Sequence, residues 1–130
     1  MAITGTHHIA IKCTDENKYE ETIRFYRDVL GMKMIRTWGE GKKSGCMLDT
    51  GNNRMEIFAC GAALDSTGSV NHFALADDNV DDTVAAVKAA GYRITVEPHD
   101  IVIGSIPPYP ARIAFCIGPN GEEIELFCEK

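Results

Sequence analysis

The sequence contains four residues with the side chains of a metal site: His8, Glu56, His72 and Glu125. Each lies in a short apolar stretch that is typical of a β-strand, such as His-Ile-Ala-Ile near the start of the chain. Imidazole nitrogens and carboxylate oxygens together form a mixed donor set that suits a divalent transition metal. Because a buried carboxylate is costly to desolvate unless it is paired, a bound cation best explains two such groups beside two histidines.

The alternation of side chains along each strand predicts which way these residues point. Ile9 and Ile11 must cover a helix, and successive side chains point to opposite faces, so His8 is expected on the concave face. The same alternation turns the other three residues toward that face: Glu56, His72 and Glu125. His7 has the parity of Ile9, so the alternation favours His8 over His7 as the ligand.

A strand–helix–strand–strand–strand unit occurs twice, and each copy carries one His in its first strand and one Glu in its last. The elements of the first copy are predicted at residues 7–13, 18–30, 33–38, 46–49 and 54–60. Those of the second are predicted at 71–76, 80–90, 92–97, 111–117 and 122–128, with an irregular stretch at 98–110. Gly31 and Gly91 end the two helices, and residues 61–69 connect the copies. The pattern predicts an α+β fold in which two β-α-β-β-β modules form a cupped, curved mixed sheet around a cavity.

Composition and charge exclude several classes of partner. The 130 residues are 45% hydrophobic and 25% charged, as expected for one folded domain, and the formal net charge is −6. An acidic chain without clustered Lys and Arg argues against nucleic acid, and no basic amphipathic or long apolar stretch indicates a membrane. There is no signal-peptide pattern, and the five cysteines form no Cys-x-x-Cys pair. We therefore expect a cytoplasmic protein with reduced thiols.

Four segments of the sequence resemble a known family: 8–11 (HIAI), 25–32 (FYRDVLGM), 71–75 (NHFAL) and 118–126 (GPNGEEIEL). On these motifs the chain resembles the vicinal oxygen chelate superfamily. That superfamily includes glyoxalase I, extradiol dioxygenases, methylmalonyl-CoA epimerase, and fosfomycin- and bleomycin-resistance proteins. The resemblance covers nearly the whole length and implies a single glyoxalase-like domain made of two repeats, at about 5–61 and 69–130.

Within the superfamily, the order His, Glu, His, Glu is similar to the ligand set of glyoxalase I (lactoylglutathione lyase). This resemblance implies that one Ni, Zn, Co or Mn ion is held by all four residues: His8, Glu56, His72 and Glu125. It also implies a homodimer and a small-molecule substrate with an α-oxo or α-hydroxy carbonyl group. A Lewis-acid cation would stabilise the enediolate formed by proton transfer, with Glu125 favoured as the base and Glu56 as its partner.

Four further residues are candidates for contact with the substrate: Lys12, Trp38, Arg112 and Tyr109. Lys12 stands where glyoxalase I enzymes carry an Arg that holds a glutathione carboxylate, and Lys keeps the charge without the bidentate geometry. Trp38 is placed to form a wall of the cavity. Arg112 shares the parity of small residues and is expected to meet an anionic substrate. Tyr109 would be the contact residue of a lid at 101–110.

Two alternatives remain on the same fold. The first is an epimerase or a ring-cleaving dioxygenase, although iron dioxygenases use two His and one carboxylate and Glu56 would be a fourth ligand. The second is a non-enzymatic protein that binds a drug or metabolite, which would not need the complete set of four residues. Bound metal in the purified protein separates the enzymes from the binder, and iron with oxygen uptake identifies the dioxygenase.

Overall fold

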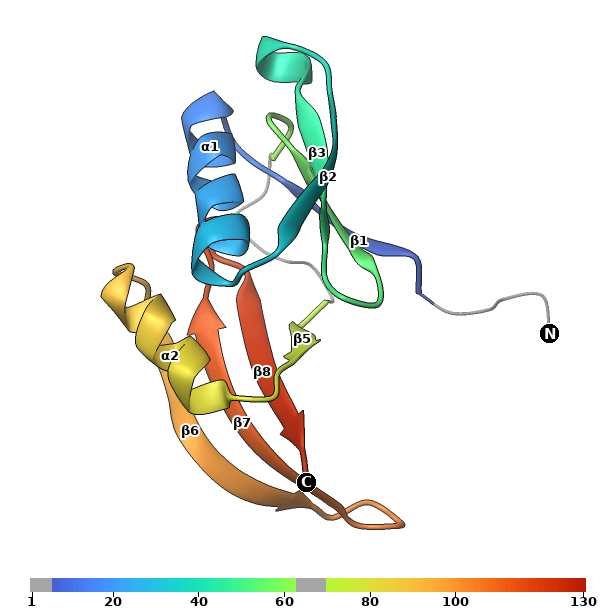
Figure 1. The fold of residues 1–130 in the computed structure, drawn as a ribbon, viewed down its shortest axis with the longest axis vertical. Coiled ribbons are helices and arrows are strands. Elements are labelled where there is room, and N and C mark those ends of the chain that lie inside the picture. Colours follow the sequence, from blue (N-terminus) through green and yellow to red (C-terminus); the bar gives the residue numbers. More distant parts are fainter. Residues whose placement is uncertain (1–5, 63–69) are drawn as a thin grey trace, which may run out of the picture. The chain divides into compact units, whose positions relative to one another are not determined.

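The computed structural model describes residues 6–62 and 70–130 of the chain. The chain divides into two compact units, Met1–Leu64 and Asp65–Lys130, which we call module 1 and module 2. Each module has one helix and one four-stranded sheet, so the predicted pair of β-α-β-β-β modules is confirmed. The sheets are mixed, and β6 and β7 bend along their length (Figure 1). Most of the predicted connector, 63–69, lies outside the described residues, as do residues 1–5.

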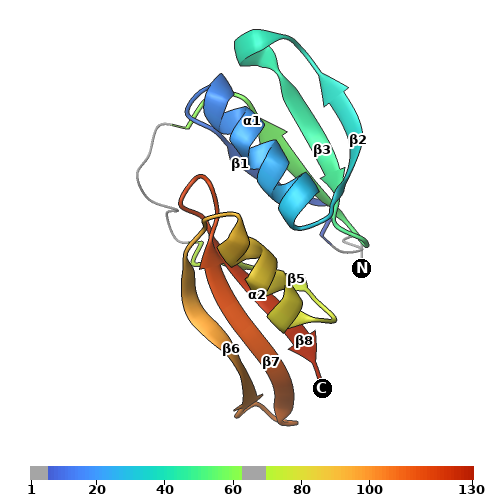
Figure 2. The same ribbon diagram turned by 60° about the vertical axis from the view of Figure 1, so that its left-hand side comes forward.

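In module 1 the first strand pairs with the last. Its strands are β1 (His8–Lys12), β2 (Lys33–Trp38), β3 (Gly45–Asp49) and β4 (Arg54–Phe58). Its helical segments are α1 (Glu16–Arg24), a π-helical turn η1 (Phe25–Val29) and a short 3-10 turn η2 (Gly41–Lys43). The strand order is β1-β4-β3-β2, in which β1 and β4 are parallel and the other pairs antiparallel. Figure 2 shows α1 lying along one face of this sheet.

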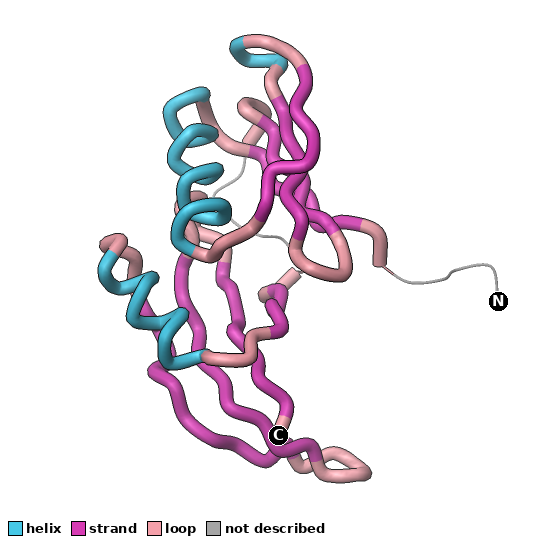
Figure 3. Tube along the Cα trace, viewed as in Figure 1, coloured by secondary structure: helices cyan, strands magenta, loops and turns pink. Residues whose placement is uncertain are grey.

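Module 2 repeats the same topology. Its elements are β5 (Phe73–Ala76), α2 (Val80–Ala89), β6 (Ile94–Ile103), β7 (Tyr109–Ile117) and β8 (Glu123–Glu129). The order β5-β8-β7-β6 matches that of module 1, again with the first and last strands parallel. Figure 3 shows the repeated sequence of strand, helix and three strands along the trace. No helix in the described parts of the chain is long and apolar enough to cross a membrane.

Helix α1 begins two residues earlier than the predicted position 18, because Asp15 caps it. The Asp15 carboxylate accepts a hydrogen bond from the Lys18 backbone N–H at 2.8 Å. At the other end, the backbone N–H of Leu30 donates to the Phe25 carbonyl at 3.0 Å, which is the wider spacing of a π-turn. This turn adds one residue to the helix repeat. As a result, the adjacent Phe25 and Tyr26 are both buried in the core of module 1.

The prediction that residues 98–110 are irregular is wrong, because most of them belong to a β-hairpin. Strand β6 continues through Pro98 to Ile103, and β7 begins at Tyr109. Pro98 is tolerated because β6 is the edge strand of its sheet and the pairing shifts register between Val96 and His99. Residues 104–108 alone form the loop, so the predicted lid at 101–110 is mainly the end of this hairpin.

In both modules the helix covers one face of the sheet, and the alternation assigns the remaining side chains to the other. Met55 and Ile57 of β4 are fully buried. In β8, Ile124 is fully buried and Leu126 is 1% exposed. The glutamate between each pair, Glu56 or Glu125, therefore lies on the face away from the helix, which we call the open face. The core thus sits between helix and sheet and turns the glutamates outward.

The buried cysteines give a test of these cores. Cys13, Cys46 and Cys116 are fully buried, and burial raises the pKa of the Cys46 thiol and raises that of Cys116 to about 11. Because the thiolate is the reactive form, an aromatic disulfide reagent at pH 8 is expected to modify only Cys60 and Cys128 in the folded protein. Peptide mapping by mass spectrometry checks this, with guanidinium-unfolded protein as the control for full reaction. Rapid modification of Cys116 in the folded protein would contradict the described core.

Candidate metal centre

The first His–Glu pair lies on the open face of module 1. Strand β1 runs parallel to β4, with Ala10 beside Glu56 and His8 beside Arg54. The His8 Nε2 lies 3.5 Å from Glu56 Oε1. The Glu56 side chain is 15% exposed, so it is largely shielded but reachable from solvent. Sequence alternation correctly predicted that these two side chains share a face.

The second pair has the same geometry in module 2. Ala74 of β5 lies beside Glu125 of β8, and His72 Nε2 is 3.5 Å from Glu125 Oε1. The ring of Phe115 packs edge-on against the His72 ring, with centroids 5.2 Å apart. Each module therefore places an alanine opposite its glutamate and a histidine two residues before that alanine. The repeat found in the sequence extends to strand register and side-chain geometry.

The residue before each histidine contacts the ring from the other side. His72 Nδ1 lies 2.6 Å from Asn71 Oδ1, and His8 Nδ1 lies 2.9 Å from His7 Nδ1. An amide oxygen only accepts hydrogen bonds, so His72 Nδ1 donates to it, and in the neutral ring the Nε2 lone pair then faces Glu125. Sequence reasoning treated His7 only as a rejected ligand and missed this contact. The sequence feature that could have indicated this contact is the polar residue that precedes the histidine in both repeats, His7 in one and Asn71 in the other.

The chemistry of these pairs fits a divalent cation. Where the imidazole Nε2 carries no hydrogen, as the Asn71 contact implies for a neutral His72, it and the carboxylate oxygen are both acceptors. At 3.5 Å they then do not satisfy each other, and a cation between them would. Metal bonds of about 2.0–2.2 Å place neighbouring ligand atoms roughly 3 Å apart, close to the observed separation. Within residues 6–62 and within residues 70–130, no third His, Cys, Asp or Glu completes a metal-binding group. Each described module thus supplies one histidine and one glutamate.

Lys12 and Trp38 both lie on the open face of module 1. Lys12 follows His8 and Ala10 along that face of β1, and its aliphatic chain crosses Gly61, where a Cβ would lie 3.3 Å from Lys12 Cδ. Trp38 covers Gly45, where a Cβ would come within 2.4 Å of the indole. The structure thus places both residues on the face where a substrate contact was predicted.

The predicted substrate contact of Arg112 is not supported by its position. Its parity partners Ala114 and Cys116 are fully buried on the helix side of β7, so the small face is the packed face. From there the guanidinium binds Asp81 of α2 through two hydrogen bonds of 2.7 and 2.9 Å and Asp100 at 3.1 Å. Arg112 therefore joins the helix to the sheet on the face opposite Glu125.

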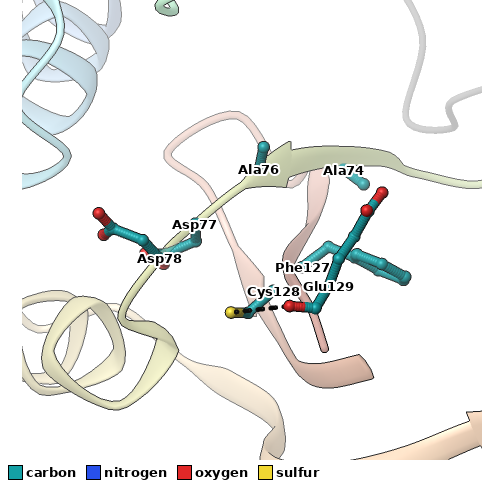
Figure 4. Close-up of a pocket in the computed structure, with 7 residues that line it drawn as sticks. All are labelled: Ala74, Ala76, Asp77, Asp78, Phe127, Cys128 and Glu129. Atoms are coloured by element: carbon teal, nitrogen blue, oxygen red, sulfur yellow. Dashed lines mark hydrogen bonds between the residues drawn. The ribbon is translucent and has the colours of Figure 1, made fainter. Parts of the chain in front are cut away.

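Tyr109 lies at the far end of the open face of module 2. Its hydroxyl donates to the Glu129 carboxylate, and its ring meets Phe127 edge-on at 5.4 Å between centroids. Beside these residues is an open pocket of about 750 Å³, which Figure 4 shows between the ends of β5 and β8. It is lined by Ala74, Ala76, Asp77, Asp78, Phe127, Cys128 and Glu129. We did not predict this pocket from the sequence. The small side chains of Ala74 and Ala76 in β5, which leave room for it, were the feature that could have indicated it.

Comparisons with known proteins agree with this fold. The sequence matches the profile described as "Glyoxalase/Bleomycin resistance protein/Dioxygenase superfamily" over residues 5–126. The chain therefore belongs to this superfamily. It is 28% identical over 125 residues to "Lactoylglutathione lyase" of Haemophilus influenzae, covering 85% of this chain and 84% of that protein. It is 29% identical to "Probable lactoylglutathione lyase, chloroplastic" of Arabidopsis thaliana, covering 92% of this chain but only 34% of that one.

Solved structures show the same fold. A glyoxalase I mutant of Zea mays has a TM-score of 0.70 at 28% identity, over 92% of this chain and 43% of that one. The protein SMU.1112c has a TM-score of 0.75 at 21% identity, over 96% of this chain and 98% of that one. The chain thus spans about a third of the length of the Arabidopsis relative and less than half of the maize structure.

The contact between Asn71 and His72 can be tested by substitution. Removing the amide in Asn71→Ala is expected to free the ring, so that the tautomer with hydrogen on Nδ1 is no longer fixed. Imidazole ¹⁵N shifts measured by NMR report the tautomer directly, and metal affinity should fall by about 10–100-fold. The matched variant His7→Asn gives module 1 the arrangement of module 2 and is expected to retain affinity. Unchanged tautomer and affinity in Asn71→Ala would show that the contact is incidental.

The ion pairs of Arg112 predict a pH-dependent contribution to stability. Hydrogen bonds from Arg112 lower the pKa of Asp81, and those from Lys130 and Arg112 lower the pKa of Asp100. Because these folded-state pKa values are depressed, the stabilisation is present above the unfolded carboxyl pKa of about 3.9 and is lost as the pH falls through the folded values. Arg112→Gln should therefore unfold at a lower temperature than wild type at pH 7, and the difference should shrink below about pH 4.

Thermal unfolding followed by circular dichroism measures this difference, with Arg112→Lys as a control that keeps the charge and should lose only part of the effect. Unchanged stability together with weaker substrate binding would restore the substrate role first expected of Arg112.

Proposed function

We propose that this protein is a metal-dependent lyase or isomerase of glyoxalase I type. The observation that supports this most strongly is the pair of matched contacts, His8–Glu56 and His72–Glu125, each 3.5 Å at the same register of a parallel strand pair. Identical placement of two acceptor pairs in two modules is difficult to explain by packing alone. The lactoylglutathione lyases among its relatives point to the same chemistry.

In this proposal one divalent ion, Ni, Zn, Co or Mn, is held by the four paired residues: His8, Glu56, His72 and Glu125. Two modules supply them, either from one chain or from two copies in a homodimer. The chemistry that such an ion supplies is Lewis-acid stabilisation of the charge that develops on two neighbouring substrate oxygens. His8 and His72 serve as ligands through Nε2, with Nδ1 held by His7 and Asn71.

The glutamates carry the proton transfer. We assign Glu125 as the base that takes a proton from the carbon next to the substrate carbonyl, and Glu56 as its partner. Phe115 lies beside Glu125 in the sheet on one side and Ala74 on the other, so the carboxylate has apolar neighbours on both strands. Glu56 has the matching neighbours, Met47 and Ala10. Both carboxylates are thus shielded but accessible.

The substrate that these surroundings suit is an α-oxo or α-hydroxy carbonyl compound, such as the adduct of an α-oxo aldehyde with a thiol. On the open face of module 1, Lys12 offers a cation for a substrate carboxylate. Trp38 and Phe58, whose ring centroids are 6.1 Å apart, offer an apolar wall for the rest of the molecule. We assign the reaction to the cytoplasm, in keeping with the reduced thiols.

The deciding experiment is an activity assay on protein whose metal has been identified by elemental analysis. With the metal restored, the methylglyoxal–glutathione hemithioacetal is expected to be converted, and Glu125→Gln and Glu56→Gln should each lower kcat by about 10²–10⁴-fold. Glu123→Gln, two residues away on the same face of β8, is the matched control and should keep full activity. Circular dichroism and metal content, measured for every variant, separate loss of the base from loss of the fold or the ion.

The other outcomes identify the alternatives. Bound iron together with oxygen uptake would indicate a ring-cleaving dioxygenase, and proton exchange on an acyl substrate without net conversion would indicate an epimerase. A protein that binds no metal in purified form and after metal addition would be a drug- or metabolite-binding member of the superfamily, and the proposal would be wrong.

A further inference from the structure

A second polar hollow lies on module 1, at the turn between β3 and β4. It has a volume of about 550 Å³ and is lined mainly by polar side chains, among them Arg36, Asp49, Asn52 and Arg54. The two arginines come from different strands, β2 and β4. None of these residues belongs to the His8–Glu56 pair or to the substrate contacts assigned above. We call this hollow the Arg36–Arg54 pocket.

Strand register places both arginines on the open face, beside the metal-binding pair. Arg54 is two residues before Glu56 on β4 and lies beside His8 of β1. Arg36 of β2 pairs with Met47 of β3, and Met47 pairs with Glu56 of β4. Arg36 and Glu56 therefore lie in one row across the sheet, two strands apart. Two residues along a strand span about 6.6 Å, and two strand spacings about 9.6 Å. A group bound between the arginines would thus be roughly 7–10 Å from Glu56.

Arg36 reaches this face because of an irregularity in β2. The pairing of β2 with β3 shifts between Met34 and Arg36, which leaves Ile35 without a partner on β3. Such a bulge reverses the alternation for the residues that follow it. Without it, Arg36 and Trp38 would have the parity of Met34, which pairs with the fully buried Leu48. The bulge therefore gathers Arg36 and Trp38 on the face of the metal-binding pair.

The pocket is lined by two arginines and one carboxylate, so positive charge is in excess. Among residues 6–62 and 70–130, neither guanidinium lies within 4.0 Å of a carboxylate, whereas Arg27 and Arg112 each pair with an aspartate. The carboxylate lining the pocket, Asp49, accepts a hydrogen bond from the Gly51 backbone N–H at 2.7 Å. Two guanidinium groups lining one hollow repel each other, and an anion between them relieves that repulsion. This local excess of positive charge occurs in a chain with a net charge of −6.

We propose that the Arg36–Arg54 pocket binds an oxyanion, a carboxylate or a phosphate, carried by the same substrate whose oxygens are held at the metal. Guanidinium forks match both groups through paired hydrogen bonds, and Asn52 adds an amide donor. The statement that the substrate carries this anion rests on the proposed function, whereas anion binding by the pocket does not. The substrate class is then an α-oxo or α-hydroxy carbonyl compound with an anionic group a few bonds from the reacting carbons.

Anion binding is tested on the metal-free protein by ¹⁵N NMR titration. Succinate and inorganic phosphate are the two probes, and dimethyl succinate is the neutral control. Saturable shifts of the backbone amides of Gly51 to Arg54 are expected with one of the anions, which identifies its class. Arg36→Gln and Arg54→Gln should each weaken that binding by about tenfold or more, because each removes charged hydrogen bonds. Lys42→Gln, in the turn at the other end of the β2–β3 hairpin, should bind as wild type does.

Three results would overturn the pocket: no saturable shift with either anion, equal shifts with the neutral ester, or unchanged affinity in both arginine variants. The link to the substrate has its own readout in the metal-loaded enzyme. There, Arg54→Gln is expected to raise KM about tenfold with kcat unchanged, since the arginine would bind ground state and transition state alike. Turnover with unchanged KM in both variants would overturn that link. Absence of turnover in wild type would refute the proposed function, and the titration would still decide the pocket.

Discussion

The central contact in each module joins a histidine and a glutamate on the open face of its sheet. Histidine Nε2 and glutamate Oε1 stand 3.5 Å apart, and the glutamate side chains are 15% and 13% exposed whereas those of the histidines are 37% and 33% exposed. Without a proton or a metal ion between them, neither atom is satisfied by the other. The surrounding fold supplies what this contact requires, which is a parallel pair of strands in fixed register with an alanine opposite the glutamate.

The rest of each module fixes that register. The apolar side chains of β4 and β8 are buried beneath a helix, and a slip of one residue would expose all of them and bury the glutamate. The helix covers the other face of the sheet and contributes no ligand. The energy that holds the glutamates in place is therefore largely hydrophobic and comes from the side chains buried beneath the helix.

Much of this could be predicted from the sequence, because alternation and an internal repeat are both periodic signals. The topology, the choice of His8 over His7 as the residue facing Glu56, and the shared face of each His–Glu pair follow from them. Alternation assigns two faces but does not say which one carries the helix, and for this reason Arg112 was predicted on the wrong side of β7. The small residues beside it, Ala114 and Cys116, allow close packing beneath α2 and do not line a cavity.

Non-periodic features lay beyond such reasoning. The bulge at Ile35 changes the parity of Arg36, and nothing in the local sequence marks it. Pro98 looked like the start of an irregular loop, but an edge strand accepts a residue without an N–H. The contacts of His7 and Asn71 with the ligand rings depend on side-chain torsions, which sequence spacing does not determine.

The alanines at positions 10 and 74 have a wider consequence. A β-branched residue would make each strand more stable, but its extra methyl groups would stand where the imidazole crosses toward the glutamate. The strands at the two histidines, β1 and β5, are also edge strands of their modules' sheets. In the proposed site the histidines belong to edge strands and the glutamates to inner ones, so fraying of β1 or β5 would release a single imidazole while the remaining three strands stayed folded. Uptake and loss of the proposed ion would then proceed through a local opening rather than through global unfolding.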